Sequence, residues 1–359
     1  MNTVFHITES FGGGVLTSIK NLTEVQNASN YNVTIVFLRR KDTPKFSDLR
    51  LMFPDIELLE IGSSNLKGFI KLFKFVNQLL LKRKDSIFHA HSSWAGVLVR
   101  IANSFIRKSK CFYTPHGYAH MRTDVSSSKR KFFQFTEILL NLISKTNVIA
   151  CGKSEALIAN KLFAQSVNIS SNFLKDPFPD SRKPNTFIPR KSKKFKIATI
   201  GRITPQKGPE RFLQATKFFD HFVEIEWIGS GAPGNLLAQN NVKITGWLQP
   251  NEVSRKIANL DALMITSEWE GLSMVGLEAL SHGVPIISSA YYGCEDLVKH
   301  GFNGFICHNE QEFSHYINLC FFDWHLMSLL KSNARQYFLD NFDQKILYMN
   351  WKEMYKIEA

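Results

Sequence analysis

Two cations follow a predicted strand in the second half of the chain, in a pattern suited to holding a diphosphate. The strand predicted over residues 196–200 is followed by Arg202, Lys207 and Pro209. Because proline fits the first turn of a helix, we expect both cations at the mouth of a helix. There they are well placed to hold phosphate oxygens by charge-assisted hydrogen bonds. The alternative is that Arg202 and Lys207 are ordinary solvated cations on the surface.

A pair of glutamates follows the strand predicted over residues 262–266. Ser273 is a suitable N-cap for the next helix, which places Glu270 in the loop and Glu278 in the early helix. The residues on either side of Glu278 are apolar, and a carboxylate in such surroundings is costly to bury unless it accepts hydrogen bonds. The vicinal hydroxyls of a ribose or hexose would supply those bonds. The alternative for Glu278 is a surface acid on the polar face of the helix.

Three glycines in the first half, Gly12, Gly13 and Gly14, lie between a strand predicted over residues 4–7 and a helix predicted over residues 15–26. Glycines let the backbone approach an anion closely, and the start of a helix offers unpaired N–H groups. An anion site is therefore expected here, with an ordinary tight turn as the alternative.

Histidines mark two further strands of the first half. His89 and His91 are two residues apart on a predicted strand, so they share one face and could form a metal pair. No third ligand is evident near them, so we expect a structural role or a role in lining an acceptor site. His116 directly follows a proline at the end of another strand and is the better candidate for a site residue.

Charge and length narrow the classes of protein that fit. The 359 residues suffice for two domains, and the 44% of hydrophobic residues supply packed cores. A formal charge of +13 calls for a polyanionic partner: nucleic acid, an anionic membrane or phosphorylated substrates. No recognition helix, RNA-binding signature or zinc module is evident, which argues against nucleic acid.

Targeting features and cysteine usage point to one compartment. No apolar run approaches the ~18–20 residues needed to span a bilayer, and residues 1–10 lack a charged leader before an apolar core. The five cysteines are scattered and lack metal-ligand spacing, so buried reduced thiols are expected. These features predict a cytoplasmic protein.

The order of the predicted elements indicates the architecture. Short β-branched or aromatic runs alternate with helical patterns in both halves, which is typical of parallel sheets covered by helices. Residues 176–195 break this rhythm with prolines and cations, as an interdomain linker does. We expect a first domain over 1–175, a second over 196–335, and a C-terminal helix over 336–359 that packs back on the first. Ligands of such sheets bind at the carboxyl ends of strands, so the site is expected in the cleft between the domains.

The glutamate pair, the cations and the glycine loop together resemble the retaining GT-B glycosyltransferases of family 4. Residues 89–92 and 113–117 are also similar to first-domain segments of that family. The resemblance implies an α/β fold of the GT-B type, with two Rossmann-like, doubly wound parallel-sheet domains facing a central cleft. The chain departs from the family pattern at residues 271–273 and 292–296, which bears on the identity of the donor sugar more than on the activity.

The resemblance also implies roles for individual residues. Glu278 would bind the donor ribose hydroxyls and Glu270 the transferred sugar, while Arg202 and Lys207 would hold the diphosphate. His116 would lie beside the sugar, so Glu270, His116, Arg202 and Lys207 are expected to act in catalysis. The other donor-binding residues expected are Gly12, Gly13, Gly14, Gly271, Leu272, Ser273 and Met274.

The expected reaction is retaining transfer of a hexose from a UDP- or GDP-sugar to a polyprenyl-diphosphate-linked or oligosaccharide acceptor, in O-antigen or capsule biosynthesis. No cofactor and no metal ion are expected, because the chain has no Asp-x-Asp pair and two cations can take over the metal's role. The alternatives are a phosphorylase or epimerase on a similar scaffold, a non-catalytic sugar-nucleotide binder, and a basic nucleic-acid-binding protein.

Two basic, aromatic-rich segments of the first half suggest where the chain meets its acceptor. Residues 66–84 and 129–133 combine lysines and arginines with phenylalanines and leucines. Such a surface fits docking on an anionic inner membrane that presents a lipid-linked acceptor. A core helix with a solvated lysine face is the alternative for residues 66–84.

Overall fold

The computed structural model describes residues 3–106, 110–178, 194–232, 234, 237 and 242–355. The chain forms two compact units. The first comprises residues 1–121, 125–173 and 344–359, and the second comprises residues 122–124 and 174–343. Most of the linker expected at 176–195 lies outside the described residues.

The first unit is built on a sheet of seven parallel strands in the order β3-β2-β1-β4-β5-β6-β7. Its strands are β1 (Thr3–Thr8), β2 (Asn32–Arg39), β3 (Glu57–Ser63), β4 (Ile87–His91), β5 (Lys110–Thr114), β6 (Asn147–Ala150) and β7 (Val167–Ile169). The central strands are buried along nearly their whole length, as parallel strands covered on both faces must be.

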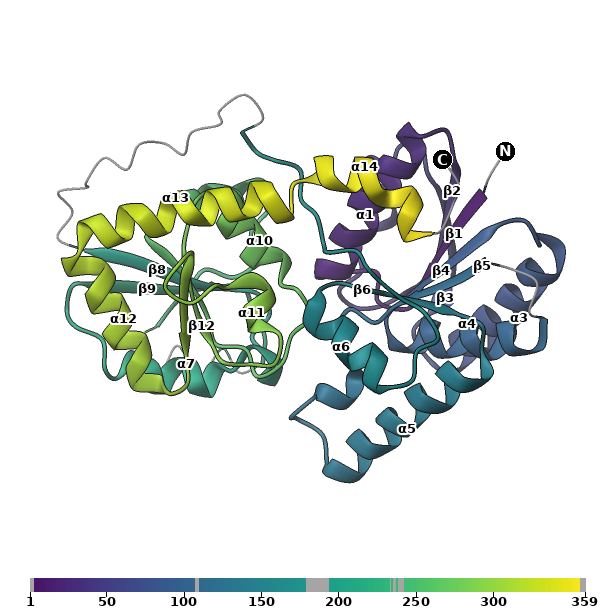
Figure 1. Cartoon of the computed structure of the whole chain (residues 1–359), viewed down its shortest axis with the longest axis horizontal. Coiled ribbons are helices and arrows are strands. Elements are labelled where there is room, and N and C mark those ends of the chain that lie inside the picture. Colours follow the sequence, from purple (N-terminus) through teal and green to yellow (C-terminus); the bar gives the residue numbers. More distant parts are fainter. Residues whose placement is uncertain are drawn as a thin grey trace. The chain divides into compact units, whose positions relative to one another are not determined.

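Helices lie on both sides of this sheet (Figure 1). They are α1 (Gly13–Ala28), α2 (Phe46–Met52), α3 (Leu66–Lys82), α4 (Ser93–Ile106), α5 (Ser127–Ile143), α6 (Lys153–Lys161) and α14 (Gln344–Met354), with a short 3₁₀ turn at Ala119–Met121. Side-chain caps define where two of them begin, because Asn65 accepts from the Gly68 N–H and Ser126 from the Lys129 N–H.

The second unit repeats the plan with six parallel strands in the order β10-β9-β8-β11-β12-β13. Its strands are β8 (Phe195–Ile200), β9 (Val223–Ile228), β10 (Lys243–Ile244), β11 (Ala262–Ile265), β12 (Ile286–Ser289) and β13 (Gly304–Cys307). Its helices are η2 (Pro205–Lys207), α7 (Pro209–Thr216), α9 (Pro250–Ala258), α10 (Met274–Ser281), α11 (Cys294–Leu297), α12 (Glu310–Phe322) and α13 (Trp324–Asn341). Two α/β units with wholly parallel sheets confirm the expected fold class.

The strand order of each sheet reverses at one point. In the first unit the reversal lies between β1 and β4, and in the second between β8 and β11. Loops that leave neighbouring strands there run to opposite sides and leave a crevice at the carboxyl ends. Candidate residues that follow these four strands are therefore placed where open α/β sheets bind their ligands.

The C-terminal segment forms two helices, not the single helix expected over residues 336–359. Helix α13 contributes Met327 and Leu330 to the core of the second unit. It ends near Phe342, whose carbonyl accepts a 3.0 Å hydrogen bond from the Leu174 N–H. Helix α14 then joins the first unit, where Trp351 is buried in the core.

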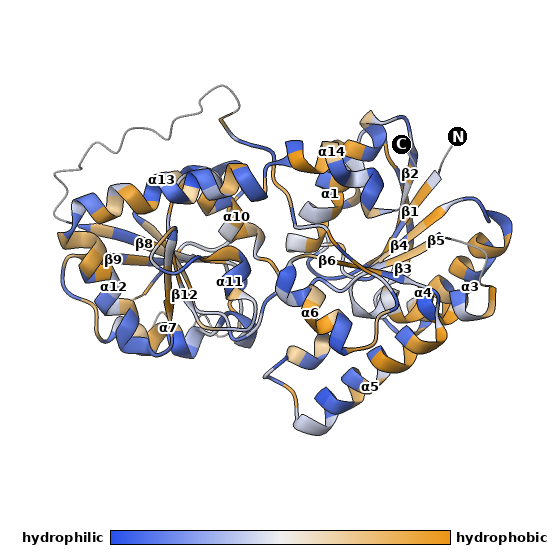
Figure 2. Cartoon of the chain, in the orientation of Figure 1, coloured by the Kyte–Doolittle hydropathy of each residue, from blue (hydrophilic) through white to orange (hydrophobic). Residues whose placement is uncertain are grey.

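Hydrophobic and hydrophilic residues are interspersed along the helices of both units (Figure 2), and several helices turn one apolar face to the core. In α3, for example, Leu72, Val76 and Leu80 are buried at a spacing of four residues. Among the described residues, no helix combines the length and the apolarity that crossing a bilayer requires.

Candidate functional site

The loop after β8 is fixed against the end of β11. Gly208 has φ +62°, and a Cβ atom there would lie 2.1 Å from the carbonyl oxygen of Thr266, so only glycine fits. The Thr266 hydroxyl donates a 2.8 Å hydrogen bond to the Lys207 carbonyl. Lys207 is thereby held at the start of α7, at the reversal point of the second sheet.

The same loop brings Lys207 to Glu270. Their side chains form an ion pair, and each is mostly buried, with 18% and 12% of its surface exposed. The Ser267 hydroxyl donates a 3.0 Å hydrogen bond to the second carboxylate oxygen of Glu270. The structure thus joins a residue that is expected to bind the diphosphate to a residue that is expected to bind the sugar.

Glu278 lies within α10, the helix in which the sequence predicted it, although in the middle of its eight residues and not in the early part. The Ser273 side chain caps this helix by accepting from the Gly276 N–H, which confirms the predicted N-cap. Burial raises the pKa of Glu278 to about 7. Within the described part of the chain, this carboxylate makes no hydrogen bond or ion pair. Glu278 is therefore a half-buried acid still able to accept hydrogen bonds from a ligand.

The remaining residues expected at the donor site differ in exposure. Arg202 is exposed, in the loop that follows β8. Leu272 and Ser273 are buried before α10, while Gly271 and Met274 are half-buried beside them. The second unit therefore presents the second-half candidates in two adjacent loops, after β8 and after β11.

The glycine loop of the first unit is shaped by packing at one position and open at another. Helix α1 begins at Gly13, two residues earlier than expected. A Cβ atom on Gly12 would lie 2.7 Å from the carbonyl oxygen of Asp42, so a close backbone approach requires that glycine. Gly13 has φ +52° and nothing within 4 Å of a Cβ position. Its neighbour Gly14 is exposed in the first turn of the helix.

His116 belongs to a cavity at the carboxyl ends of β4, β5 and β6. Its backbone has φ +54°, a conformation that residues other than glycine seldom adopt. Glu155 stabilises the loop by accepting 2.7 Å hydrogen bonds from the Gly117 and Cys151 N–H groups. The cavity is lined by His91, Thr114, His116 and Cys151, and by polar residues of α1 and of the segment after β7.

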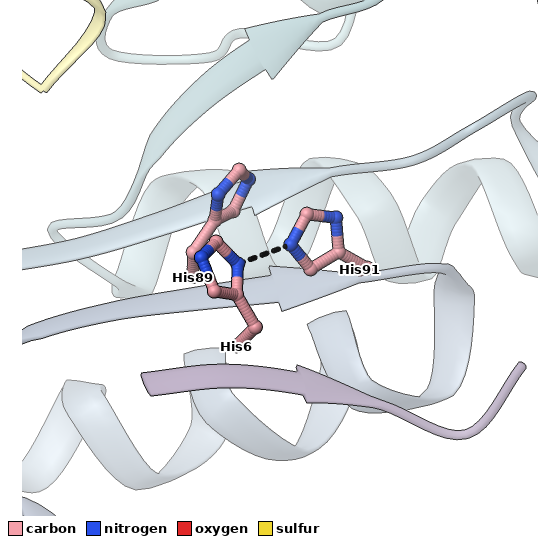
Figure 3. A group of neighbouring side chains, drawn as sticks. All are labelled: His6, His89 and His91. Atoms are coloured by element: carbon pink, nitrogen blue, oxygen red, sulfur yellow. Dashed lines mark hydrogen bonds between the residues drawn. The ribbon is translucent and has the colours of Figure 1, made fainter. Parts of the chain in front are cut away.

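The expectation that His89 and His91 have no third partner was wrong. His6 on β1 pairs in register with His89 on β4, and one ligand atom from each of the three rings lies within 4.8 Å of the others. Figure 3 shows the three rings converging from two neighbouring strands. No spacing in the sequence marks this group, because 85 residues separate His6 from His91 and only the strand order places β1 beside β4.

Three neutral imidazoles at this separation could hold a transition metal. Burial lowers the pKa of His6 to about 4 and also lowers those of His89 and His91, so the rings are neutral at pH 7. However, both ring nitrogens of each histidine already have protein partners, which are Gln26, His91, Thr114, Tyr355, His6 and His116. A metal would have to displace these hydrogen bonds.

Sequence reasoning missed the residues that orient the candidates. Ser267 holds Glu270, Glu155 holds the His116 loop, and Gln26 and Tyr355 reach the histidines from α1 and from the end of α14. Each is a polar residue within or beside an apolar pattern, which is the one signal that could have marked them. Ser267 lies three residues from Glu270, whereas Gln26 and Tyr355 contact histidines that are 20 and 266 residues away, too far for residue spacing to reveal the contacts.

Comparisons with known proteins agree with this architecture. Residues 181–337 match the family model described as glycosyl transferases group 1. The UDP-Gal:alpha-D-GlcNAc-diphosphoundecaprenol alpha-1,3-galactosyltransferase of Escherichia coli is 28% identical over 271 residues, 67% of this chain and 66% of that one. An uncharacterized 41.2 kDa protein in the cps region of Klebsiella pneumoniae is 25% identical over 328 residues, 86% of each chain.

A solved structure extends the likeness over the whole fold. The structure of Anabaena Alr3699/HepE in complex with UDP and glucose matches with a TM-score of 0.80 at 18% identity, covering 99% of this chain and 100% of that one. The fold and the sequence matches define a glycosyltransferase with the GT-B fold. The match to the group 1 model and the named glycosyltransferases among the relatives support the predicted resemblance to family 4.

Proposed function

We propose that this glycosyltransferase moves a hexose from a nucleoside-diphosphate sugar with retention of anomeric configuration and without a metal ion. The observation that carries the proposal is the Lys207–Glu270 pair, which joins the loops after the two strands at the reversal point of the second sheet, with Glu278 on the helix that follows the second of these loops. One cation and two carboxylates suit a donor in which a diphosphate links the transferred sugar to a ribose, because both sugars carry hydroxyls that can donate to a carboxylate.

The chemistry accounts for each group. Departure of the diphosphate develops negative charge on its oxygens, and a preorganised cation such as Lys207 stabilises that charge in the transition state. Glu270 would accept hydrogen bonds from the sugar, and Glu278 from the ribose. Because Lys207 is already held by Glu270 and by its own loop, little reorganisation is needed when the donor binds.

The acceptor and the pathway are proposed from the relatives. The E. coli relative is named for transfer from UDP-Gal to GlcNAc linked to diphosphoundecaprenol. The K. pneumoniae relative is named for its cps region. We infer a lipid-linked or oligosaccharide acceptor in bacterial surface polysaccharide biosynthesis, such as O-antigen or capsule, with a UDP- or GDP-sugar as donor.

An exposed apolar stripe on α5 supports peripheral attachment at an anionic membrane on the cytoplasmic side. Phe132 and Phe135 are 65% and 61% exposed, and Leu139 and Leu142 continue the stripe at helical spacing. Lys129 and Lys131 lie at its start, where the first turn has no acid. Two features bring such a helix to a membrane: apolar side chains that insert into the lipid, and cations that are attracted to anionic headgroups.

Product release tests the reaction. The purified enzyme is incubated with UDP- and GDP-sugars, first alone and then with a lipid-linked acceptor, in the presence of a chelator. We expect nucleoside diphosphate only when both substrates are present, no loss of rate with the chelator, and a product whose anomeric configuration by NMR matches that of the donor. Glu270→Ala should fold normally and abolish transfer; release without acceptor, or unchanged turnover in this variant, would contradict the proposal.

Liposome flotation tests the membrane surface separately. The wild-type enzyme should bind vesicles containing anionic lipid at low salt, and the double variant Phe132→Ser, Phe135→Ser should bind them weakly. Phe322→Ser is the matched control, because Phe322 is 73% exposed on the second unit. Equal binding by the double variant and the wild type would remove α5 from the docking surface.

A further inference from the structure

One continuous hydrogen-bonded chain links the buried histidines of the first unit to its cavity. Seven contacts make it up: Thr114 Oγ1–His89 Nε2 (2.8 Å), His89 Nδ1–Tyr355 Oη (2.7 Å), Tyr355 Oη–Gln26 Nε2 (3.1 Å), Gln26 Oε1–His6 Nε2 (2.7 Å), His6 Nδ1–His91 Nε2 (2.9 Å), His91 Nδ1–His116 Nε2 (3.0 Å) and His116 Nδ1–Cys151 Sγ (3.5 Å). Both of its ends, Thr114 and Cys151, line the cavity.

The amide of Gln26 sets the direction of this chain. Its Nε2 donates to the Tyr355 hydroxyl, so its Oε1 faces His6 and can only accept. His6 must therefore carry its proton on Nε2, which leaves Nδ1 to accept from His91. His91 donates from Nε2 to His6, so its own Nδ1 carries no proton and accepts from His116.

The order ends with a defined form of His116. Because His91 accepts from Nε2 of His116, that nitrogen carries the proton and Nδ1 keeps a free lone pair. The lone pair faces the Cys151 thiol, a weak donor that burial holds in the protonated form by raising its pKa. Burial lowers the pKa of His116 to about 4, so the ring is neutral.

The opposite order is also self-consistent, which is why Gln26 matters. If the amide turned over, each imidazole would donate from the other nitrogen, and His116 would present an N–H group at Nδ1 instead of a lone pair. In the order seen here the Tyr355 hydroxyl accepts from the amide nitrogen of Gln26 and can then donate to His89, so Gln26 and Tyr355 hold each other through this hydrogen bond. Tyr355 is itself buried against Phe112 and Trp351.

We propose that Gln26, anchored by Tyr355, is a positioning residue that acts through His6 and His91 to hold His116 as the Nε2-protonated neutral imidazole. Nδ1 of His116 then accepts a hydrogen bond from a hydroxyl group of a bound sugar, which takes the place of the Cys151 thiol. This role in the reaction rests on the proposed function, whereas the tautomer itself does not.

Histidine NMR measures the tautomer directly. The enzyme is labelled with ¹⁵N-histidine, and the His116 signals are assigned by their absence from His116→Asn. In the wild type we expect a protonated Nε2 and an unprotonated Nδ1. In Gln26→Met, which keeps the side-chain length but removes both polar atoms, we expect His116 to exchange between both tautomers.

A second pair of variants separates positioning from simple loss of stability. Tyr355→Phe keeps the buried ring but frees the Gln26 amide, so it should also mix the tautomers. Tyr31→Phe removes a hydroxyl from the same core, where Tyr31 stacks edge-on against Trp351, and should leave His116 unchanged. A wild-type His116 protonated on Nδ1, or one unchanged tautomer in both Gln26→Met and Tyr355→Phe, would overturn the proposal.

Kinetics then connects the tautomer to the reaction. If half or less of the enzyme holds the competent tautomer, kcat should fall about two- to tenfold, while KM for the donor should change less, because most of the residues proposed to bind the donor lie in the second unit. A mixed tautomer with an unchanged kcat would remove His116 Nδ1 from the reaction. Absence of transfer by the wild type would count against the proposed function and leave the NMR result standing.

Discussion

Lys207 and Glu270 form an ion pair although 63 residues separate them in the chain. The pair joins the loop after β8 to the loop after β11, the two central strands of the second sheet. Each partner also has a local support, since Thr266 binds the Lys207 carbonyl and Ser267 binds the Glu270 carboxylate. A cation and an acid are therefore held in one geometry before any ligand arrives.

Replacing Lys207 tests whether the cation stabilises the leaving diphosphate. Lys207→Met removes the charge and keeps most of the side chain. We expect kcat to fall about 10²- to 10³-fold, the usual cost of losing one preorganised electrostatic contact to a developing charge. Steady-state kinetics with saturating donor measures the loss.

The pair between Lys256 and Glu226 provides the control for that experiment. It lies in the same unit with an N–O distance of 2.8 Å, but it joins α9 to β9, away from the reversal point of the sheet. Lys256→Met should therefore leave kcat within about twofold, because this partly buried pair lies outside the loops after β8 and β11 and would stabilise no charge on the leaving group. Equal losses in the two variants would show that Lys207 matters only for the fold.

Gly208 is expected to be irreplaceable for two separable reasons. In Gly208→Ala the left-handed backbone costs about 1–2 kcal/mol, and the new methyl group meets the Thr266 carbonyl 2.1 Å away. Gly301→Ala isolates the first term, because Gly301 has φ +75° and nothing within 4 Å. Thermal unfolding should show a clearly larger drop in Tm for Gly208→Ala; similar drops would mean that the loop moves aside at no cost.

The two sheets and most strands of this chain could be predicted from the sequence, because apolar runs and turn residues are local signals. Glu278 and its cap at Ser273 were also predictable, since helix starts carry a local code. The Lys207–Glu270 pair and the link from Tyr355 to His89 were not. They depend on strand order and on the return of α14 to the first unit, and no spacing in the sequence records either.

Donor affinity should depend on the ionisation of Glu278. Its pKa is raised by burial to about 7, so at pH 6 the group is mostly protonated and can accept fewer hydrogen bonds. Binding of ribose hydroxyls favours the carboxylate, so affinity should rise as the pH rises through 7 and level off above it. Calorimetric titration with UDP from pH 5.5 to pH 8.5 measures this.

Glu278→Gln is the control, because it keeps the shape of the side chain and cannot ionise. The phosphate of UDP titrates in the same range, so the informative quantity is the difference between the two proteins at each pH. We expect the wild type to gain affinity relative to Glu278→Gln between pH 6 and pH 8. Parallel curves would place the carboxylate away from the nucleotide.

The histidine network predicts how the first unit responds to acid. Burial lowers the pKa of His6 and His116 to about 4 and lowers those of His89 and His91, whereas unfolded histidine titrates near 6.5. Between these values the unfolded state binds more protons than the folded state. The free energy of unfolding should therefore be highest above pH 6.5 and fall as the pH is lowered towards 4, by up to about 1.4 kcal/mol per pH unit for each histidine.

Hydrogen exchange by mass spectrometry resolves this response within the chain. Amides of β1 and β4, which carry His6, His89 and His91, should lose protection between pH 7 and pH 5 once the intrinsic effect of pH on exchange is removed. The β8 and β11 amides of the second unit serve as the internal reference, because neither strand contains a histidine. An equal loss in both units would assign the acid response to groups outside the network, and the buried imidazoles would then contribute no pH dependence of their own.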